Sequence, residues 1–148
     1  MTVMQKVETK KNVVVNSNFT PPHDMENERA VLGSILIRSD AIHDIIDVVK
    51  PESFYSPQNQ IIYEAILKLH SKLKPIDLLT LSTHLDEHSQ LEKVGGKAYI
   101  ASLAESAPTS INARSYAETV QKYSIMRNLI HASETIRSLA YDSRRDLQ

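Results

Sequence analysis

Apolar residues recur three and four positions apart along most of this chain, and that spacing predicts α-helices. The first predicted helix runs from about Met25 to Arg38, with Asp24 in the N-cap position. Gly33 stands in its interior, where glycine costs about 1 kcal/mol relative to alanine. Because glycine is useful where another backbone comes close, we expect a second helix to cross the first at Gly33.

Four further segments show the same helical spacing, and turn-forming residues separate them. They cover about residues 42–49, 57–72, 78–87 and 99–107. Asp40, Ser56 and Asp77 stand just before the first three of these segments, where an N-cap belongs. Phe54, in the turn before the longest of them, is expected to enter the core.

The last helical segment is the longest, since neither proline nor glycine occurs from Ala113 to Tyr141. At about 100° per residue, apolar residues before Ser124 gather on one side of the helix and those after it gather nearly opposite. We therefore expect the second half to protrude and form an interface, because an uncovered apolar row favours aggregation. The expected interface row consists of Ile125, Met126, Leu129, Ile136 and Leu139. A bend near Ser124, which would return the second half to the same core, is the alternative.

The composition favours an all-α protein that binds other proteins. Only three glycines and no cysteines occur in 148 residues, which excludes disulfides and thiolate metal sites and suits a reducing compartment such as the cytoplasm. With 17 basic and 18 acidic residues the net charge is −1, so no broad positive field draws the chain to DNA or to an anionic membrane. No apolar run approaches the roughly 20 residues that span a bilayer, and we expect no membrane contact.

Three patterns raise the question of chemistry. The segment His84 to His88 matches H-x-x-E-H, a zinc-protease pattern that would make His84, Glu87 and His88 a metallohydrolase site. We favour a solvated helix end there, since no third ligand follows at a suitable spacing. The Gly95-Gly96-Lys97 triplet lacks the other residues of a phosphate-binding loop and predicts an interhelix bend.

The third pattern is a set of arginines on the last helix, which alternates with acidic residues and therefore indicates a solvated face rather than a DNA contact. The set is Arg114, Arg127, Arg137, Arg144 and Arg145. We expect no catalytic, cofactor-binding or metal residues in this chain.

Several segments, taken in order, resemble the landmarks of one family. PPHDMENERAVLGSIL at 21–36 matches a P-P-x-x-x-E-x-E-x-x-V-L-G first helix. KPESFYSPQNQIIYEAI, PIDLLTLSTHL, LEKVGGKAYIASLAESAPTSINARSYAETV and MRNLI follow in the family's order. Over about residues 21–146 the chain therefore resembles the N-terminal domain of bacterial replicative DNA helicases of the DnaB type.

The resemblance implies a compact globule of about five short helices over residues 23–110, after a flexible tail at 1–22. Residues 111–148 would be a long helix that forms the first arm of a helical hairpin. The second arm is expected to begin around Asp146-Leu147 and to be missing from this sequence. Hairpins of neighbouring subunits would pair, so that the helicase ring carries a collar of dimers.

The resemblance also implies docking partners for this domain and a separate catalytic domain. The collar would dock primase and, in some bacteria, a helicase loader, with Tyr99, Ile130 and Ile136 as candidate docking residues. ATP hydrolysis with Mg²⁺ and DNA unwinding would belong to a further domain, since this chain lacks Walker motifs. We therefore expect a non-enzymatic assembly module of a cytoplasmic, nucleoid-associated helicase. A free-standing helical adaptor that shares this domain is the alternative.

Overall fold

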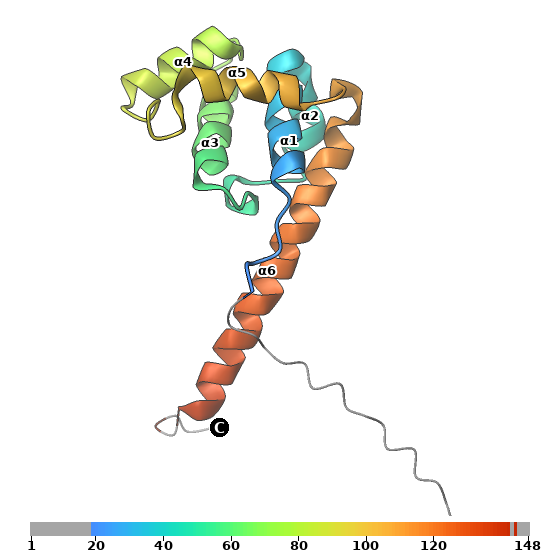
Figure 1. Cartoon of the computed structure of the whole chain (residues 1–148), viewed down its shortest axis with the longest axis vertical. Coiled ribbons are helices and arrows are strands. Elements are labelled where there is room, and N and C mark those ends of the chain that lie inside the picture. The colour runs from blue at the N-terminus through green and yellow to red at the C-terminus, as the bar shows by residue number, and fades with distance from the viewer. Residues whose placement is uncertain (1–18, 143, 145–148) are drawn as a thin grey trace, which may run out of the picture.

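A computed structural model describes residues 19–142 and Arg144, and these residues form helices joined by loops, with no strand among them. Five helices make a compact head: α1 (Met25–Ile37), α2 (Ile42–Ile45), α3 (Pro57–Ser71), α4 (Leu78–Glu87) and α5 (Gly96–Ser106). The sixth, α6 (Ala113–Tyr141), starts within the head and extends far beyond it (Figure 1). The predicted all-α fold is confirmed. Residues 1–18 of the predicted tail at 1–22 and the expected second arm at Asp146-Leu147 lie outside the described residues.

Side-chain caps define the starts of three helices, as the sequence predicts. The Asp24, Ser56 and Asp77 side chains accept hydrogen bonds from the backbone N–H groups three residues ahead, at 2.9, 3.4 and 2.7 Å. Each bond satisfies a donor that the first helical turn leaves unpaired. Pro57 at the first position of α3 adds a backbone already suited to a helix.

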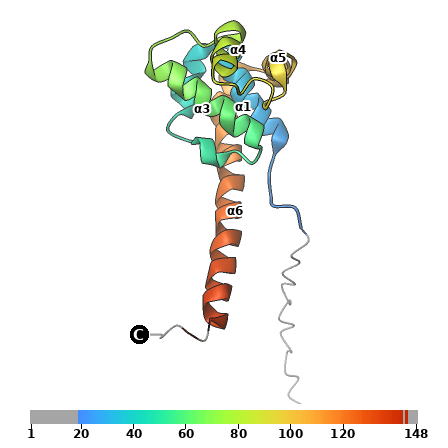
Figure 2. The same cartoon turned by 90° about the vertical axis from the view of Figure 1, so that its left-hand side faces the viewer.

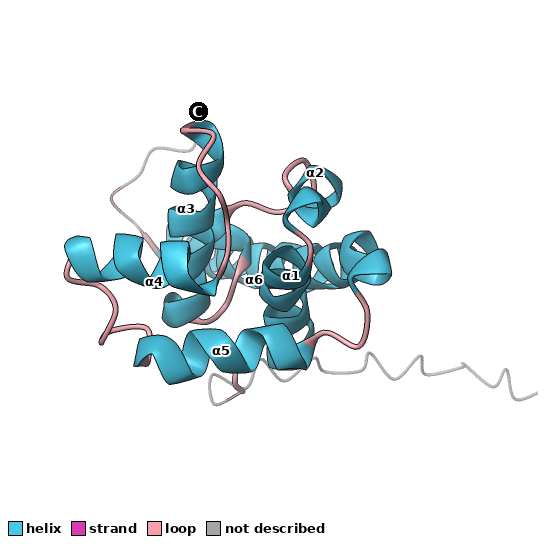
Figure 3. Ribbon diagram, turned by 90° about the horizontal axis from the view of Figure 1, so that it is seen from above, coloured by secondary structure: helices cyan, strands magenta, loops and turns pink. Residues whose placement is uncertain are grey.

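The head is built around α1, which packs against both α5 and α6 (Figure 3). The core includes Leu32 and Ile35 of α1, Ile66 of α3, and the predicted plug Phe54, which is buried against Tyr63 with ring centroids 5.0 Å apart. The fully buried core residues of the first half of α6 are two alanines and a valine, Ala113, Ala117 and Val120, with Tyr116 packed against the core as a partly buried side chain. Small side chains allow that half of α6 to lie close to the head.

The segment at 42–49 departs from the predicted single helix. A 3₁₀ turn, Ser39–Ala41, leads into the one-turn helix α2, and the chain then turns through Val48 and Val49. Asp40 makes no capping bond, and Ile46 is exposed. The β-branched run has low helix propensity, and Lys50 before Pro51 adopts the extended backbone that a following proline favours. These local preferences end the helix early.

Gly95 and Gly96 form the predicted bend between α4 and α5. Both have a left-handed backbone, with φ of 100° and 73°, a conformation that glycine adopts without steric cost. Gly95 stands just before α5 in the N-cap position without a side chain to cap it. The bend folds α5 back over α1 (Figure 1).

Candidate protein interface on the long helix

The second half of α6 leaves the head, and apart from the half-buried Arg127 its residues are exposed from Ile125 to Tyr141. Ser124 is its last buried residue, and α6 continues unbroken to Tyr141 (Figure 2). The bend near Ser124 that we weighed as an alternative is therefore wrong. Leu129 and Ile136, in the predicted interface row, are 65% and 68% exposed. Ile125, Met126 and Leu139 are exposed as well.

Within this half, the spacing of apolar residues is that of a coiled-coil seam. Ile125, Leu129, Ala132, Ile136 and Leu139 recur at alternating steps of four and three. Residues at such positions lie in one line along the helix and insert between the side chains of a facing helix. This line is the surface that we call the α6 seam.

A second apolar strip lies beside the α6 seam. Met126, Ile130, Ala140 and Tyr141 belong to it, and all four are exposed. At about 100° per residue, the seam and this strip together span an arc of about 200°, which Ser133 and Arg137 interrupt on the second strip, whereas the stripe that a helix buries against one core is about 100° wide. The second half of α6 therefore has room for two neighbouring helices, one on each strip.

The opposite side of this half is polar. His131, Glu134, Thr135 and Ser138 occupy it. No ion pair joins these residues to the head, among the pairs that the described residues form. Water can cover this side, so the need for a partner is confined to the apolar arc.

Arg127 fastens α6 to the head at the point where the helix leaves it. Its Nη1 donates to the Pro22 carbonyl oxygen at 2.9 Å and its Nη2 donates to the Ser53 carbonyl oxygen at 2.7 Å. The guanidinium group also lies 5.5 Å from the centre of the Tyr55 ring, whose other contact is a stacked His23 at 4.1 Å. Three segments far apart in sequence thus meet at one side chain, which sets the direction in which α6 projects.

The other described arginines of the predicted set do not form a basic strip, and Arg145 lies outside the described residues. Arg114 pairs with Asp47 at 3.5 Å and Glu118 at 3.3 Å, and Arg144 contacts Asp142 at 3.3 Å. The predicted solvated face holds for these exposed pairs, but Arg127 departs from it. Sequence spacing does not distinguish Arg127, because its acceptors are backbone carbonyls 74 and 105 residues away.

A buried carboxylate organises the head behind this interface. Glu28, which is 1% exposed, accepts hydrogen bonds from Tyr55 N–H at 2.8 Å, Ser56 N–H at 3.2 Å and the Asn59 side chain at 3.1 Å. It therefore lies at the N-terminus of α3, where backbone donors and the helix dipole favour a negative group. Sequence analysis missed this burial, since glutamate in a first helical turn is normally exposed.

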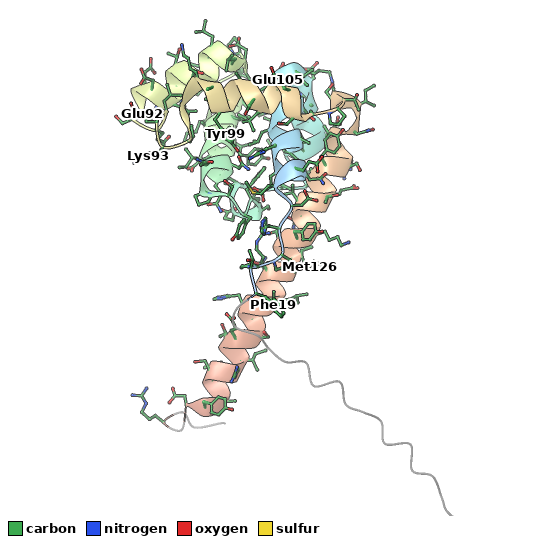
Figure 4. All side chains as sticks on the ribbon, in the orientation of Figure 1. Phe19, Glu92, Lys93, Tyr99, Glu105 and Met126 are labelled. Atoms are coloured by element: carbon green, nitrogen blue, oxygen red, sulfur yellow. The ribbon has the colours of Figure 1, made fainter. Side chains whose placement is uncertain are left out.

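Tyr99, one of the predicted docking residues, extends this network. Its hydroxyl donates to Asn59 Oδ1 at 2.6 Å, and the Arg29 guanidinium lies 5.9 Å from its ring centre. Tyr99 belongs to α5, and its side chain is half-buried (Figure 4). Ile130 and Ile136, the other two predicted docking residues, lie on α6 well away from Tyr99. The three therefore do not form one continuous patch on a single chain.

The two histidines of the H-x-x-E-H pattern, His84 and His88, stack their rings on each other. Their ring centroids are 4.3 Å apart, and the His88 Nδ1 atom lies 2.7 Å from the His84 carbonyl oxygen. His84 is 8% exposed, so the expectation of a solvated helix end is wrong for it. Burial, followed by the positive charges of His88, Lys72 and Lys68, lowers the pKa of His84. Among the described residues, no group of three or more potential ligands is placed to hold a metal ion.

No helix in the described part of the chain is long and apolar enough to cross a membrane.

Comparison with known proteins gives one consistent family. The model of the DnaB-like helicase N-terminal domain matches residues 20–122. The chain is similar to the replicative DNA helicase DnaB of Leifsonia xyli, with 37% identity over 122 residues, 82% of this chain and 27% of that protein. It is similar to the replicative DNA helicase DnaC of Bacillus subtilis, with 39% identity over 121 residues and the same two coverages. The chain thus spans about a quarter of the length of these curated relatives.

Comparison with solved structures indicates the same family. The N-terminal domain of DnaB helicase from Mycobacterium tuberculosis superposes with a TM-score of 0.82 at 34% identity, covering 84% of this chain and 91% of that one. The corresponding domain from Helicobacter pylori, described together with its interactions with primase, superposes with a TM-score of 0.68 at 28% identity, covering 78% and 90%.

Proposed function

Because this chain belongs to the DnaB-like helicase N-terminal domain family, we propose that it assembles helicase subunits and docks their partners. The observation that carries the proposal is the exposed apolar arc on the second half of α6. An apolar arc too wide for one neighbour is expected of a helix that packs on a second helix and on another copy of the chain. We infer that the α6 seam, Ile125 and Leu139 included, and Met126 on the strip beside it are covered in the assembled protein.

Partner docking forms the second part of the proposal. A relative from Helicobacter pylori and a further DnaB-like helicase are both described by their interactions with primase. By this likeness we propose primase as a partner, and a helicase loader as another, with Tyr99, Ile130 and Ile136 in or beneath the docking surface. Tyr99 and the two α6 residues come from distant parts of one chain. A surface that uses all three is best made when two copies pair.

Catalysis is assigned to the remainder of the longer helicase. The relatives are replicative DNA helicases of which this chain spans about a quarter. We propose that ATP with Mg²⁺ and DNA bind outside residues 1–148, that the ring is a hexamer, and that the protein acts in the cytoplasm at the nucleoid. This chain supplies the collar on which the ring is arranged.

The experiment is to measure molar mass by light scattering across a dilution series for the wild-type chain and for Leu129→Ser with Ile136→Ser. We expect the double variant to shift toward monomer while its helix content by circular dichroism stays the same. Ile111→Ser is the control, because Ile111 is an even more exposed isoleucine, at 83%, but lies outside α6. Equal loss of helix content and of mass would place the two residues in a private core and refute the proposal.

Primase docking is tested separately with the full-length helicase and its own primase. Ile130→Ser should weaken primase binding in a titration by more than any change in the mass of the hexamer, measured on the same sample, accounts for, and Ile111→Ser should leave both unchanged. Unchanged primase affinity in the Ile130 variant would remove that residue from the docking surface.

A further inference from the structure

A hollow of about 300 Å³ lies between the end of α3 and the side of α4. It is lined by the apolar Leu69 and Leu79 and by the polar Lys74, Thr80, Thr83, His84 and Glu87. Both helices belong to the part of the head that lies away from the second half of α6 (Figure 1). Two exposed leucines, Leu73 and Leu78, lie next to it in sequence. We call this surface the α3–α4 groove.

Leu73 is an unexpected residue at its position. It follows the end of α3 with a left-handed backbone, φ 55°, and is 92% exposed. Its N–H bonds to the His70 carbonyl and the N–H of Lys74 bonds to the Leu69 carbonyl, each at 3.0 Å, which is the Schellman arrangement that glycine normally completes. Leucine therefore adds backbone strain and exposed apolar surface at one point, with no contact inside the head that offsets them.

The rim of the groove is basic on the α3 side. Lys68, Lys72 and Lys74 lie at the end of α3, and Lys74 lines the groove itself. Only Lys68 has an ion-pair partner in the described part of the chain, Glu64 at 3.7 Å. Lys72 and Lys68 are both close enough to His84, on the α4 side, to disfavour its protonation. On that side Glu87 is the acidic group lining the groove. The leucines of the groove and the free lysines along one edge match a ligand that is apolar on the side facing the groove and acidic on one flank.

We propose that the α3–α4 groove docks an amphipathic helix of another protein, whose apolar face covers Leu73 and Leu79 and whose acidic flank pairs with Lys72 and Lys74. A helix presents apolar residues at i, i+3, i+4 and i+7, which fills a groove of this kind. The shallow floor suits side chains from one face of a helix. This surface is independent of the proposed assembly through α6.

The test uses the whole chain and a synthetic helical peptide of about 18 residues, about five turns, with leucines on one face and glutamates along one flank. A second peptide carries lysine in place of glutamate, and a third has the first composition in scrambled order. Binding is measured by fluorescence anisotropy and located by amide chemical shifts. We expect the glutamate peptide to bind at least about ten-fold more tightly than either control, with shifts at Leu73, Leu79 and Thr83.

Variants separate docking from folding. Leu73→Gly removes the side chain and also relieves the left-handed strain, so we expect binding to weaken at least about ten-fold while the melting temperature stays equal or rises. Ser89→Gly is the matched control, since Ser89 follows α4 with the same φ of 55° and the same hydrogen-bond pattern but carries no apolar side chain and lies beyond the C-terminal end of α4 instead of at the end of α3. Lys72→Glu with Lys74→Glu should reverse the preference between the glutamate and lysine peptides.

Four results would overturn the proposal. The first is equal binding of the lysine peptide. The second is amide chemical-shift changes on the second half of α6 instead of the groove. The third is displacement of the peptide by single-stranded oligothymidine at the same residues. The fourth is a smaller oligomer for Leu73→Gly, which would make the groove a contact between copies of this chain.

Discussion

The carbonyl oxygen of Leu103 in α5 occupies the space that a side chain at Gly33 of α1 would need. A Cβ built at Gly33 overlaps this oxygen and lies 3.0 Å from the Leu103 carbonyl carbon. The helix crossing that sequence analysis predicted at Gly33 is therefore confirmed, with α5 as the crossing helix. Glycine here weakens α1 locally but lets two backbones approach each other.

Gly33→Ala should destabilise the head although alanine is the better helix former. The gain of about 1 kcal/mol in helix propensity is smaller than the 1 to 3 kcal/mol or so that overpacking against rigid backbone costs. Urea unfolding should show a lower midpoint with an unchanged slope. Gly96→Ala is the comparison, because a Cβ at Gly96 meets no atom within 4 Å and is opposed only by its positive φ. A stabilised Gly33→Ala variant would contradict the crossing.

Glu28→Gln should destabilise the chain by about 1 to 3 kcal/mol. The carboxylate accepts three hydrogen bonds from α3 and the residues before it, whereas an amide presents an N–H₂ group to at least one of those donors. Thermal and urea unfolding measure the change. Glu26→Gln, an exposed neighbour in the same first turn, should stay within about 0.5 kcal/mol of wild type.

Arg127→Lys should loosen the base of α6. Lysine cannot bond the Pro22 and Ser53 carbonyl oxygens with one planar group, so we expect a loss of about 1 to 2 kcal/mol. Amide hydrogen exchange should quicken around residues 22–24 and 121–128 while the core of α3 stays protected. Arg137→Lys is the control on the same helix, since the Arg137 contact is with the exposed Tyr141 ring. Equal exchange in both variants would show that Arg127 does not hold α6.

His84 should make the chain less stable as the pH falls. Its folded-state pKa is lowered, chiefly by burial, so below the ordinary value near 6.5 the unfolded chain binds the proton first. Stability is therefore full above that pH and declines on acidification below it. Melting temperatures between pH 7.5 and pH 5 measure the effect, roughly one unit either side of the ordinary histidine pKa. His84→Gln should flatten the decline, whereas His131→Gln, on the exposed side of α6, should leave it unchanged.

Local patterns in the sequence were sufficient for the caps, the helix spans and the bend. Asp24, Ser56 and Asp77 act on donors three residues away, and Gly95-Gly96 acts on its own backbone, so neighbouring residues decide the outcome. The shift of the apolar face at Ser124 is equally local, since helical periodicity alone determines which residues share a side. The conformation of residues 42–49 was harder to predict, because a full-length helix and a short helix followed by a turn bury the same isoleucines.

Only the tertiary structure decided the roles of Glu28, Arg127 and His84. A charged or polar residue is normally predicted at the surface, and its burial depends on partners that the fold brings close. Glu28 needs donors 27 to 31 residues away, and Arg127 needs carbonyls 74 and 105 residues away. Spacing along the chain carries no signal for such pairs. Periodicity therefore determined which face of each helix is apolar, while the packing of the helices decided which polar groups hold the head together and direct α6 outward.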